Sequence, residues 1–206
     1  MASLYERFVL PGLLKCACAS PGIMKQRAMV VPGAAGKVLE LGIGMGLNLA
    51  YYDPSKVESV TGVDPAAELR AIALAAPHDP NLTVRVEDGT AEALPFEDGS
   101  FDCVVCTFTL CSVHTPVKAL SEARRALKPG GRFLYCEHGL APDADVVKWQ
   151  RRIEPVWKRI AGGCHLTRPV TSAITAAGFH VRKQDSQYIP KAPRFAGWVE
   201  WGEATV

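Results

Sequence analysis

The sequence predicts an α/β fold built on a parallel sheet, and three observations support this class. Short apolar runs that end in turn residues alternate, from Lys37 onwards, with alanine-rich helical segments, which is the pattern of βαβ units. The first of these runs ends in three glycines spaced two apart, as in a tight turn after a strand. With 206 residues, 48% of them hydrophobic, the chain can bury the core of a single domain.

The composition excludes several classes of function and location. The chain holds 23 basic and 21 acidic residues, a net charge of +2, and no basic run that could neutralise a track of phosphates. We therefore expect no nucleic-acid partner. Seven cysteines, an odd number set mostly in apolar runs, indicate a reducing, cytoplasmic compartment. No stretch reaches the roughly 18 apolar residues of a membrane span, and the N-terminus lacks the layout of a signal peptide.

The predicted elements follow one another along the chain. Residues 1–31 mix apolar and basic side chains around two Pro-Gly pairs, which predicts short helices ahead of the main fold. Strands are then expected at 37–42, 57–64, 82–88, 101–110 and 131–138, with helices between them at 47–52, 66–76 and 115–128. A Lys-Pro-Gly-Gly turn stops the last of these helices.

The remaining third of the chain predicts two helices and two strands. A long helix is expected over 143–164, interrupted near Pro155, with a cationic last turn and a glycine pair after it. A second helix over 169–178 has Pro169 in its first turn and stops at Gly178. Strands are expected over 179–189 and 197–204.

The loop after the first strand is the first candidate binding element. Gly42, Gly44 and Gly46 form a G-x-G-x-G spacing, and a helix is expected from about Gly46, so backbone N–H groups and the positive helix end would face a ligand. Dinucleotide sites use G-x-G-x-x-G, and Leu47 stands where their third glycine falls. Taken alone, the motif fits a tight turn without a ligand about equally well.

Polar residues follow the next two strands. Asp64 ends the second strand, 22 positions after Gly42, where a carboxylate can accept hydrogen bonds from both hydroxyls of a ribose. Since it precedes Pro65, it could also cap a helix, and the two roles are compatible. The third strand is followed by short residues that suit edge-on contact with an adenine ring or, equally, an ordinary surface turn: Asp88, Gly89, Thr90 and Ala91.

Four motifs in unbroken order, LELGIGMG, GVDP, GTAEALPFEDGSFDCVV and RRALKPGGRFLY, resemble those of the class I S-adenosylmethionine-dependent methyltransferases. The resemblance implies a Rossmann-like, doubly wound sheet of seven strands, mostly parallel with an antiparallel last strand. It implies S-adenosylmethionine as cofactor, S-adenosylhomocysteine as product, and no metal. The cofactor-binding residues that it implies are Gly42, Gly44 and Gly46 at the methionine portion, Asp64 and Pro65 at the ribose, Asp88, Gly89, Thr90 and Ala91 at the adenine, and Asn48 and Thr107 beside them.

The resemblance also divides the chain. One methyltransferase domain is expected over residues 1–206, with a lid or cap at 1–31, a cofactor-binding core at 37–137 and a substrate cap at 142–178. One position departs from the family pattern, because many members carry an aspartate where this chain has Thr90. The acceptor for the adenine amino group would then be Asp88 or the Thr90 hydroxyl.

Three other segments, VVCTFTLCSV, LYCEHG and WQRRIEPVWKRIAGGCHLTR, are similar to the membrane-associated alkyl-thiol methyltransferases, the methyltransferase-like seven group. This similarity favours a small apolar thiol as the methyl acceptor. The glycine loop also resembles that of bacterial phosphatidylethanolamine N-methyltransferases, so a phospholipid amine or a quinone-type acceptor is the alternative. Members of the thiol group carry an N-terminal hydrophobic anchor with no counterpart before Lys37, so membrane residence is not carried over. A peripheral membrane contact through residues 1–31 stays open.

The chemistry of the acceptor decides which residues the site needs. An attacking thiolate and a sulfonium lose opposite charges as they react, so an apolar, water-poor pocket favours the transition state. Alignment of the acceptor then matters more than a dedicated base. His114 and His138 follow strand ends, where substrates of open α/β sheets bind, and either could take a proton or be an ordinary loop histidine.

Further candidates for substrate contact come from other segments: Tyr5, Cys111, Trp149, Trp157 and His165. Tyr5 could fold over the cofactor or lie on the surface. The two tryptophans are eight positions apart and share a helix face, so one would pack in the core and the other line the pocket. His165 lies in the segment Cys-His-Leu-Thr-Arg, where a structural turn is equally plausible, and Cys164 precedes it near the expected substrate cap.

Cys103 and Cys106 form a C-x-x-C, but on a strand they point to opposite faces and cannot chelate one ion together, so we expect buried thiols.

Two alternatives from other functional classes remain at this point. A nicotinamide oxidoreductase would also use a glycine loop, although the G-x-G-x-G spacing argues against it. A catalytically silent module could retain the cofactor motifs without activity. The sequence does not indicate an oligomeric state.

Overall fold

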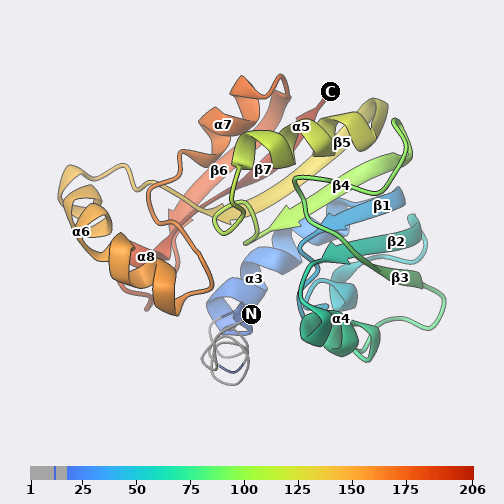
Figure 1. The fold of residues 1–206 in the computed structure, drawn as a ribbon, viewed down its shortest axis with the longest axis horizontal. Helices are drawn as coiled ribbons and strands as arrows, with labels where there is room; N and C mark the ends of the chain where they lie inside the picture. Colours follow the sequence, from blue (N-terminus) through green and yellow to red (C-terminus); the bar gives the residue numbers. More distant parts are fainter. Residues whose placement is uncertain (1–11, 13–17) are drawn as a thin grey trace.

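Seven strands form one sheet in the order β3-β2-β1-β4-β5-β7-β6, with helices on both faces (Figure 1). The structure is a computed structural model that describes Gly12 and residues 18–206. The strands are β1 (Gly36–Leu41), β2 (Val57–Asp64), β3 (Thr83–Asp88), β4 (Phe101–Thr107), β5 (Leu127–His138), β6 (His180–Tyr188) and β7 (Trp198–Thr205). Only the pairs formed by β7 are antiparallel. The predicted Rossmann-like sheet with an antiparallel last strand is therefore confirmed.

The helices form one layer on each face of this sheet. On one face, α5 (Pro116–Ala126) and α7 (Val170–Ala176) bury Leu120 and Ile174 in a core with Phe133. On the other, α3 (Pro21–Val30) and α4 (Ala67–Leu74) cover the sheet, and Ala73 packs in a core with Val60. Both layers are visible in Figure 1, α5 and α7 above the sheet and α3 and α4 below it.

The structure of β4 confirms that the two cysteines of the C-x-x-C are buried and point to opposite faces. Cys103 is buried in the core beneath α4, and Cys106 in the core beneath α5. Their thiols therefore face opposite sides of the sheet, as the period-two alternation of a strand requires.

The remaining elements, apart from the 3₁₀ turn that precedes β1, follow the carboxyl ends of strands. They are the long helix α6 (Ala144–Ile160), the short α8 (Arg194–Gly197) that packs against it, and two 3₁₀ turns, η1 (Val31–Gly33) and η2 (Leu49–Tyr51). Among the described residues, no helix combines the length and apolar character needed to cross a membrane.

Three predicted element bounds were wrong for local reasons. No α-helix follows the glycine loop: Gly46 has a φ of +74°, which an α-helix cannot accommodate, and only the 3₁₀ turn η2 forms. α6 continues through Pro155 instead of breaking there. β5 already begins at Leu127, because the Lys-Pro-Gly-Gly turn forms an irregularity within the strand, with Gly130 at a φ of +75°.

Candidate functional site

The site forms where the order of the strands reverses. β1 lies between β2 and β4, so the connections leave the sheet in opposite directions on either side of it. Ligands of open α/β sheets bind in the crevice outside the carboxyl ends of the strands at this point. The loops after β1, β2, β4 and β5 meet there, and they carry most of the residues that the sequence analysis selected.

The three glycines of the loop after β1 are required for different reasons. A Cβ at Gly42 would lie 2.5 Å from Thr109 Oγ1, and one at Gly46 would lie 2.9 Å from the Ala76 Cβ. Both glycines therefore make room for the protein itself. A Cβ at Gly44 would meet only the Gly42 carbonyl oxygen, at 3.8 Å, so Gly44 borders open space that a ligand could fill.

Asp64 connects this loop to the end of β2. Its carboxylate accepts hydrogen bonds from the backbone N–H of Gly44 at 3.0 Å and of Ala66 at 2.9 Å. The predicted helix cap is not formed, because Ala66 is the N-cap of α4 and has no side-chain cap bond. Burial raises the pKa of Asp64, and the two N–H groups oppose that shift. Each carboxylate oxygen still has a free lone pair, which suits a ribose hydroxyl.

The residues expected beside the adenine lie around the end of β3. Ala91 is buried, whereas Thr90 and Asp88 are exposed. Asp88 pairs with Arg70 at 2.9 Å, and the same guanidinium nitrogen donates to the Asp64 carbonyl oxygen at 2.7 Å. Arg70 thus holds the ends of β2 and β3 together, a role that the sequence analysis missed.

A buried polar network supports the glycine loop from the side of α3. Arg27 donates from Nη1 to Asn48 Oδ1 at 2.9 Å and to Thr107 Oγ1 at 2.6 Å. Asn48 donates to Glu40 Oε1 at 2.9 Å, and the Tyr52 hydroxyl donates to Glu40 Oε2 at 2.7 Å. The polar atoms of Asn48 and Thr107, two predicted cofactor contacts, are thus engaged within the protein.

Two atoms of α3 test whether the expected cofactor fits this crevice. Among the described residues, Gln26 Oε1 and Arg27 Nε are buried and lack a hydrogen-bond partner. Such orphaned groups cost free energy unless a ligand or water satisfies them. An acceptor oxygen and a cationic donor complement the ammonium and carboxylate of a methionine moiety, so the donor set fits S-adenosylmethionine. A basic residue within the apolar 1–31 segment was the only sequence signal for Arg27.

A second buried carboxylate shapes the side of the crevice away from this network. Glu137, next to the end of β5, accepts hydrogen bonds from three successive backbone N–H groups, those of Thr109 at 2.7 Å, Leu110 at 3.0 Å and Cys111 at 3.2 Å. The Thr109 hydroxyl in turn donates to the Leu41 carbonyl at 3.0 Å. Glu137 therefore fixes the loop after β4 against the glycine loop.

Cys111, His138 and Cys164 come together beside that loop. Their ligand atoms all lie within 4.8 Å of one another, and the Cys164 Sγ is 4.0 Å from His138 Nδ1. Both cysteines are buried, and His138 is half-buried with its ring edge-on to Phe108. The hydrogen bond from Cys111 lowers the pKa of the Cys164 thiol, and His138 adds to this effect. The same bond, together with burial, raises the pKa of the Cys111 thiol.

Trp157 and His165 border this cluster, whereas other candidates do not. The Trp157 indole N–H, with no other partner among the described residues, contributes to the lowered pKa of Cys164. His165 is 3.3 Å from Glu154, and burial lowers its pKa, as does Arg168.

The remaining candidates lie elsewhere. His114 is exposed, and its backbone N–H donates to Glu92 at 2.8 Å. Trp149, 57% exposed, borders an apolar groove between α6 and α8 instead of the cluster. Tyr5 lies outside the described residues.

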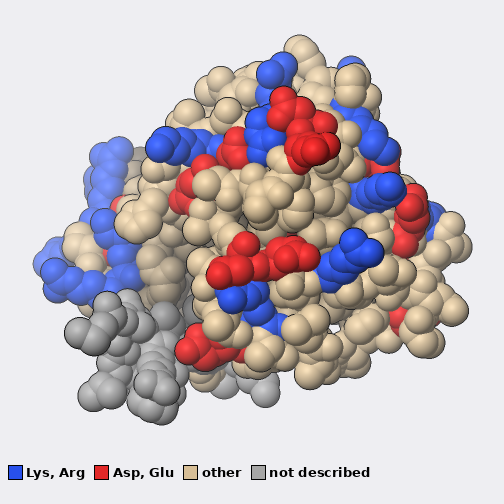
Figure 2. Space-filling view, turned by 45° about the vertical axis from the view of Figure 1, so that its right-hand side comes forward, with Lys and Arg blue, Asp and Glu red and all other residues tan. Residues whose placement is uncertain are grey.

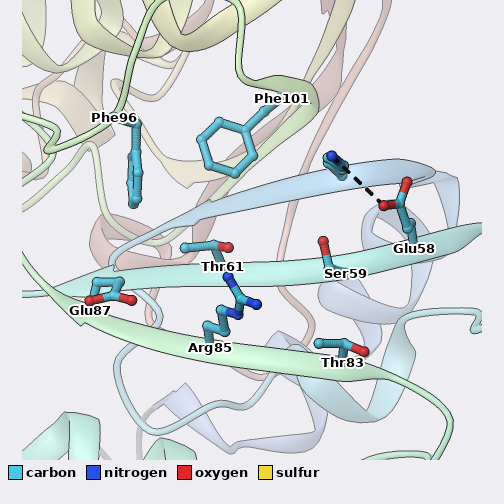
Figure 3. Close-up of a pocket in the computed structure, with 9 residues that line it drawn as sticks. Glu58, Ser59, Thr61, Thr83, Arg85, Glu87, Phe96 and Phe101 are labelled. Carbon is cyan, nitrogen blue, oxygen red and sulfur yellow. Dashed lines mark ion pairs between the residues drawn. The ribbon is translucent and has the colours of Figure 1, made fainter.

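Two surface features lie away from the crevice. A hollow of about 480 Å³ lies over β2 and β3, where the polar side chains of Thr61, Thr83 and Arg85 face Phe96 and Phe101 (Figure 3). It opens to solvent on the face of the sheet, which separates it from the strand ends. Basic and acidic side chains are interspersed on the face shown in Figure 2, so this face carries no continuous basic track.

Comparisons with known proteins agree with this geometry. The family model described as "Methyltransferase domain" matches residues 39–135. The chain is 36% identical to thiol S-methyltransferase TMT1B of Rattus norvegicus, over 78% of this chain and 68% of that protein. It is also 36% identical to TMT1B of Homo sapiens, over 80% and 71%. An S-adenosylmethionine-dependent methyltransferase structure from Mesorhizobium loti superposes with a TM-score of 0.67, 19% identity and coverage of 91% and 99%.

Glu40 predicts a pH dependence of stability. Burial raises its pKa to about 7 from 4.5, against the hydrogen bond from Tyr52 and the charge of Arg27. Between these two values the folded state binds more protons than the unfolded state, so the free energy of unfolding falls as the pH rises through this window. We expect a loss on the order of 1 to 3 kcal/mol in urea titrations at increasing pH, and a smaller loss in Glu40→Gln. Equal pH dependence of the two proteins would contradict this.

Asp64 predicts a loss of cofactor affinity when its carboxylate is removed. Asp64→Ala deletes the acceptor at the end of β2 and frees the Gly44 N–H that it holds. We expect S-adenosylhomocysteine to bind about 10- to 100-fold more weakly by isothermal titration calorimetry, the cost of a charged hydrogen bond. Asp79→Ala, which alters an exposed turn, is the matched control. An unchanged affinity in Asp64→Ala would rule out the proposed pocket.

Proposed function

Since the chain belongs to the class I S-adenosylmethionine-dependent methyltransferases, close to the TMT1 group, we propose that its methyl acceptor is a small apolar thiol. The observation that carries this proposal is the buried cluster of Cys111, His138 and Cys164 at the carboxyl ends of β4 and β5. When bound, S-adenosylmethionine supplies the methyl group. The nicotinamide oxidoreductase considered from the glycine loop is set aside by the family assignment.

We assign the cofactor to the crevice between α3 and the loops after β1, β2 and β3. Asp64 would hold the ribose, Gly44 would border the methionine portion, and Gln26 and Arg27 would satisfy its charged end. The other predicted contacts near this path are Gly42, Gly46, Pro65, Asp88, Gly89, Thr90 and Ala91. Asn48 and Thr107 would act from beneath, by fixing Arg27.

The surroundings of the cluster suit a thiol. Phe108 and Trp157 provide apolar walls, which exclude water from a reaction in which opposite charges are lost. The Cys164 sulfur, whose pKa the hydrogen bond from Cys111 lowers, and the neighbouring His138 ring are the groups to which the acceptor thiol could lose its proton. α6 and the loop that follows it bring Trp157 and Cys164 over the strand ends, the role expected of a substrate cap.

A lipid acceptor is the second candidate, and one observation favours it. Trp149 and Val156 of α6 are 57% and 60% exposed, and the groove beside Trp149 is lined mainly by apolar side chains. Basic residues flank this surface: Lys148, Arg151, Arg152, Lys158 and Arg159. A basic amphipathic helix of this kind can rest on an anionic lipid surface.

The proposed function predicts thiol-dependent turnover. We expect the purified chain with S-adenosylmethionine to release S-adenosylhomocysteine when a small alkyl thiol is added, and to form the S-methyl product by mass spectrometry. The matched acceptors are an alkyl amine and an alcohol of the same chain length, which should give little product. Product from a phospholipid amine or a quinol, with none from thiols, would replace this proposal with the second candidate.

The proposed function also predicts the effect of replacing His138. His138→Gln should lower kcat for thiol methylation by about 100-fold or more, because the cluster beside the acceptor loses its imidazole. S-adenosylhomocysteine affinity should stay unchanged, which separates this loss from damage to the cofactor pocket. His180→Gln, an exposed histidine on β6, is the control. Equal losses in the two variants would show that the cluster does not serve the reaction.

A further inference from the structure

Three side chains from separate segments converge with the donor set of a metal site. Cys111 follows β4, His138 ends β5, and Cys164 follows α6. Their ligand atoms lie within 4.8 Å of one another, and no other group of three such residues does so in the described part of the chain. Two thiols and one imidazole are a common donor set for Zn²⁺, which is borderline-soft.

The spacing is close to that of a tetrahedral site. With Zn–S and Zn–N bonds of about 2.3 Å and 2.1 Å, two ligand atoms on one zinc lie about 3.6 to 3.8 Å apart. The Cys164 Sγ is 4.0 Å from His138 Nδ1. A contraction of up to about 1 Å, within the reach of side-chain rotation, would close the three ligands around an ion.

The backbone already holds the two cysteine loops together. The His165 N–H donates to the Cys111 carbonyl at 2.7 Å, and Arg168 donates to the carbonyls of Leu110 and Val113. Glu137 fixes the Cys111 N–H from the other side. These contacts hold the loops through their backbone atoms and do not involve the sulfurs, so the ligands are placed before any metal binds.

The charges around the cluster also leave room for a dication. Glu137, Glu92 and Glu154 accept hydrogen bonds from these loops and Arg168 donates to them, so carboxylates outnumber the one cation among their charged hydrogen-bonding partners within residues 18–206. Two thiolates would then carry two uncompensated negative charges in a buried place, which is costly. One Zn²⁺ would neutralise them.

We propose that Cys111, His138 and Cys164 bind one Zn²⁺ and leave a fourth coordination position open toward the acceptor. Binding exchanges the thiol protons for the metal, so these protons are released to solvent. Resting on the proposed function, the open position would take the acceptor sulfur: the S–H bond breaks, its proton goes to solvent, and a Zn–S bond forms. The methyl group then passes to that sulfur, which leaves the metal as the thioether while S-adenosylhomocysteine departs. His138 would then be a ligand and not a proton acceptor.

Metal binding can be measured without cofactor or thiol acceptor. The reduced full chain, kept in a phosphine reductant, would be titrated with Zn²⁺ against a chromophoric chelator and separately with Co²⁺. We expect one Zn²⁺ per chain, a thiolate-to-cobalt charge-transfer band in the near ultraviolet, and proton release on binding. Cys111→Ser and Cys164→Ser should each weaken Zn²⁺ binding by about 100-fold or more and lose the cobalt band.

Cys103→Ser is the matched control, because it removes a buried thiol that lies in the core beneath α4 and outside the cluster, and it should bind as the unmodified chain does. Failure of the unmodified chain to bind Zn²⁺, or equal binding by all three variants, would overturn the proposal. The proposal would also fail if Cys111 and Cys164 were found in a disulfide and the protein still bound no Zn²⁺ after this disulfide had been reduced. Because none of these readouts uses methyl transfer, they would leave thiol methylation to be judged by its own assay.

Discussion

The buried carboxylate of Glu137 is the contact on which both halves of the site depend. Removing a charge from water is costly, and three backbone N–H groups and the Cys106 thiol offset that cost. Burial still raises the pKa of Glu137. By capping the loop after β4, this carboxylate places Thr109 against the glycine loop and Cys111 beside His138. One side chain thereby fixes the glycine loop relative to the cluster of Cys111, His138 and Cys164.

The crevice divides into two polar environments with different tasks. On the side of α3, Arg27 bonds to Asn48 and Asn48 to Glu40, and Gln26 Oε1 and Arg27 Nε are buried without a partner among the described residues. On the other side, Arg168 and Glu137 bond to backbone atoms, and the sulfurs of Cys111 and Cys164 contact each other and His138. Rigid support beneath a few free reactive groups is the arrangement that in-line methyl transfer requires, since the protein must supply alignment.

The glycine loop shows that close packing within a protein and close approach by a ligand both require glycine in the sequence. Gly42 and Gly46 are needed because Thr109 and Ala76 occupy the space of a side chain, whereas Gly44 borders open space. The positive φ angles of all three add the same demand for glycine. The spacing of a glycine motif therefore cannot by itself say which residues face the ligand.

The sequence alone determined the class of fold, the order of the strands along the chain and the position of Asp64 at a strand end. Period-two alternation, alanine-rich helices and turn residues are local properties that neighbouring residues express directly. Its resemblance to the thiol methyltransferases also pointed to the segments around Cys111, His138 and His165, whose role in acceptor binding stays a prediction. It missed Gln26, Arg27, Glu137 and Arg168, and it expected a helix after the glycine loop.

Only the tertiary structure decided how these segments meet. Glu137 precedes His138 in an apolar strand, and nothing in that strand shows that its carboxylate caps a loop 26 to 28 residues earlier. Cys111, His138 and Cys164 are distant in sequence, and parallel strands with a crossing helix bring them within 4.8 Å. Such contacts depend on sheet register and loop path, which are set by the packing of the whole core and not by the residues on either side.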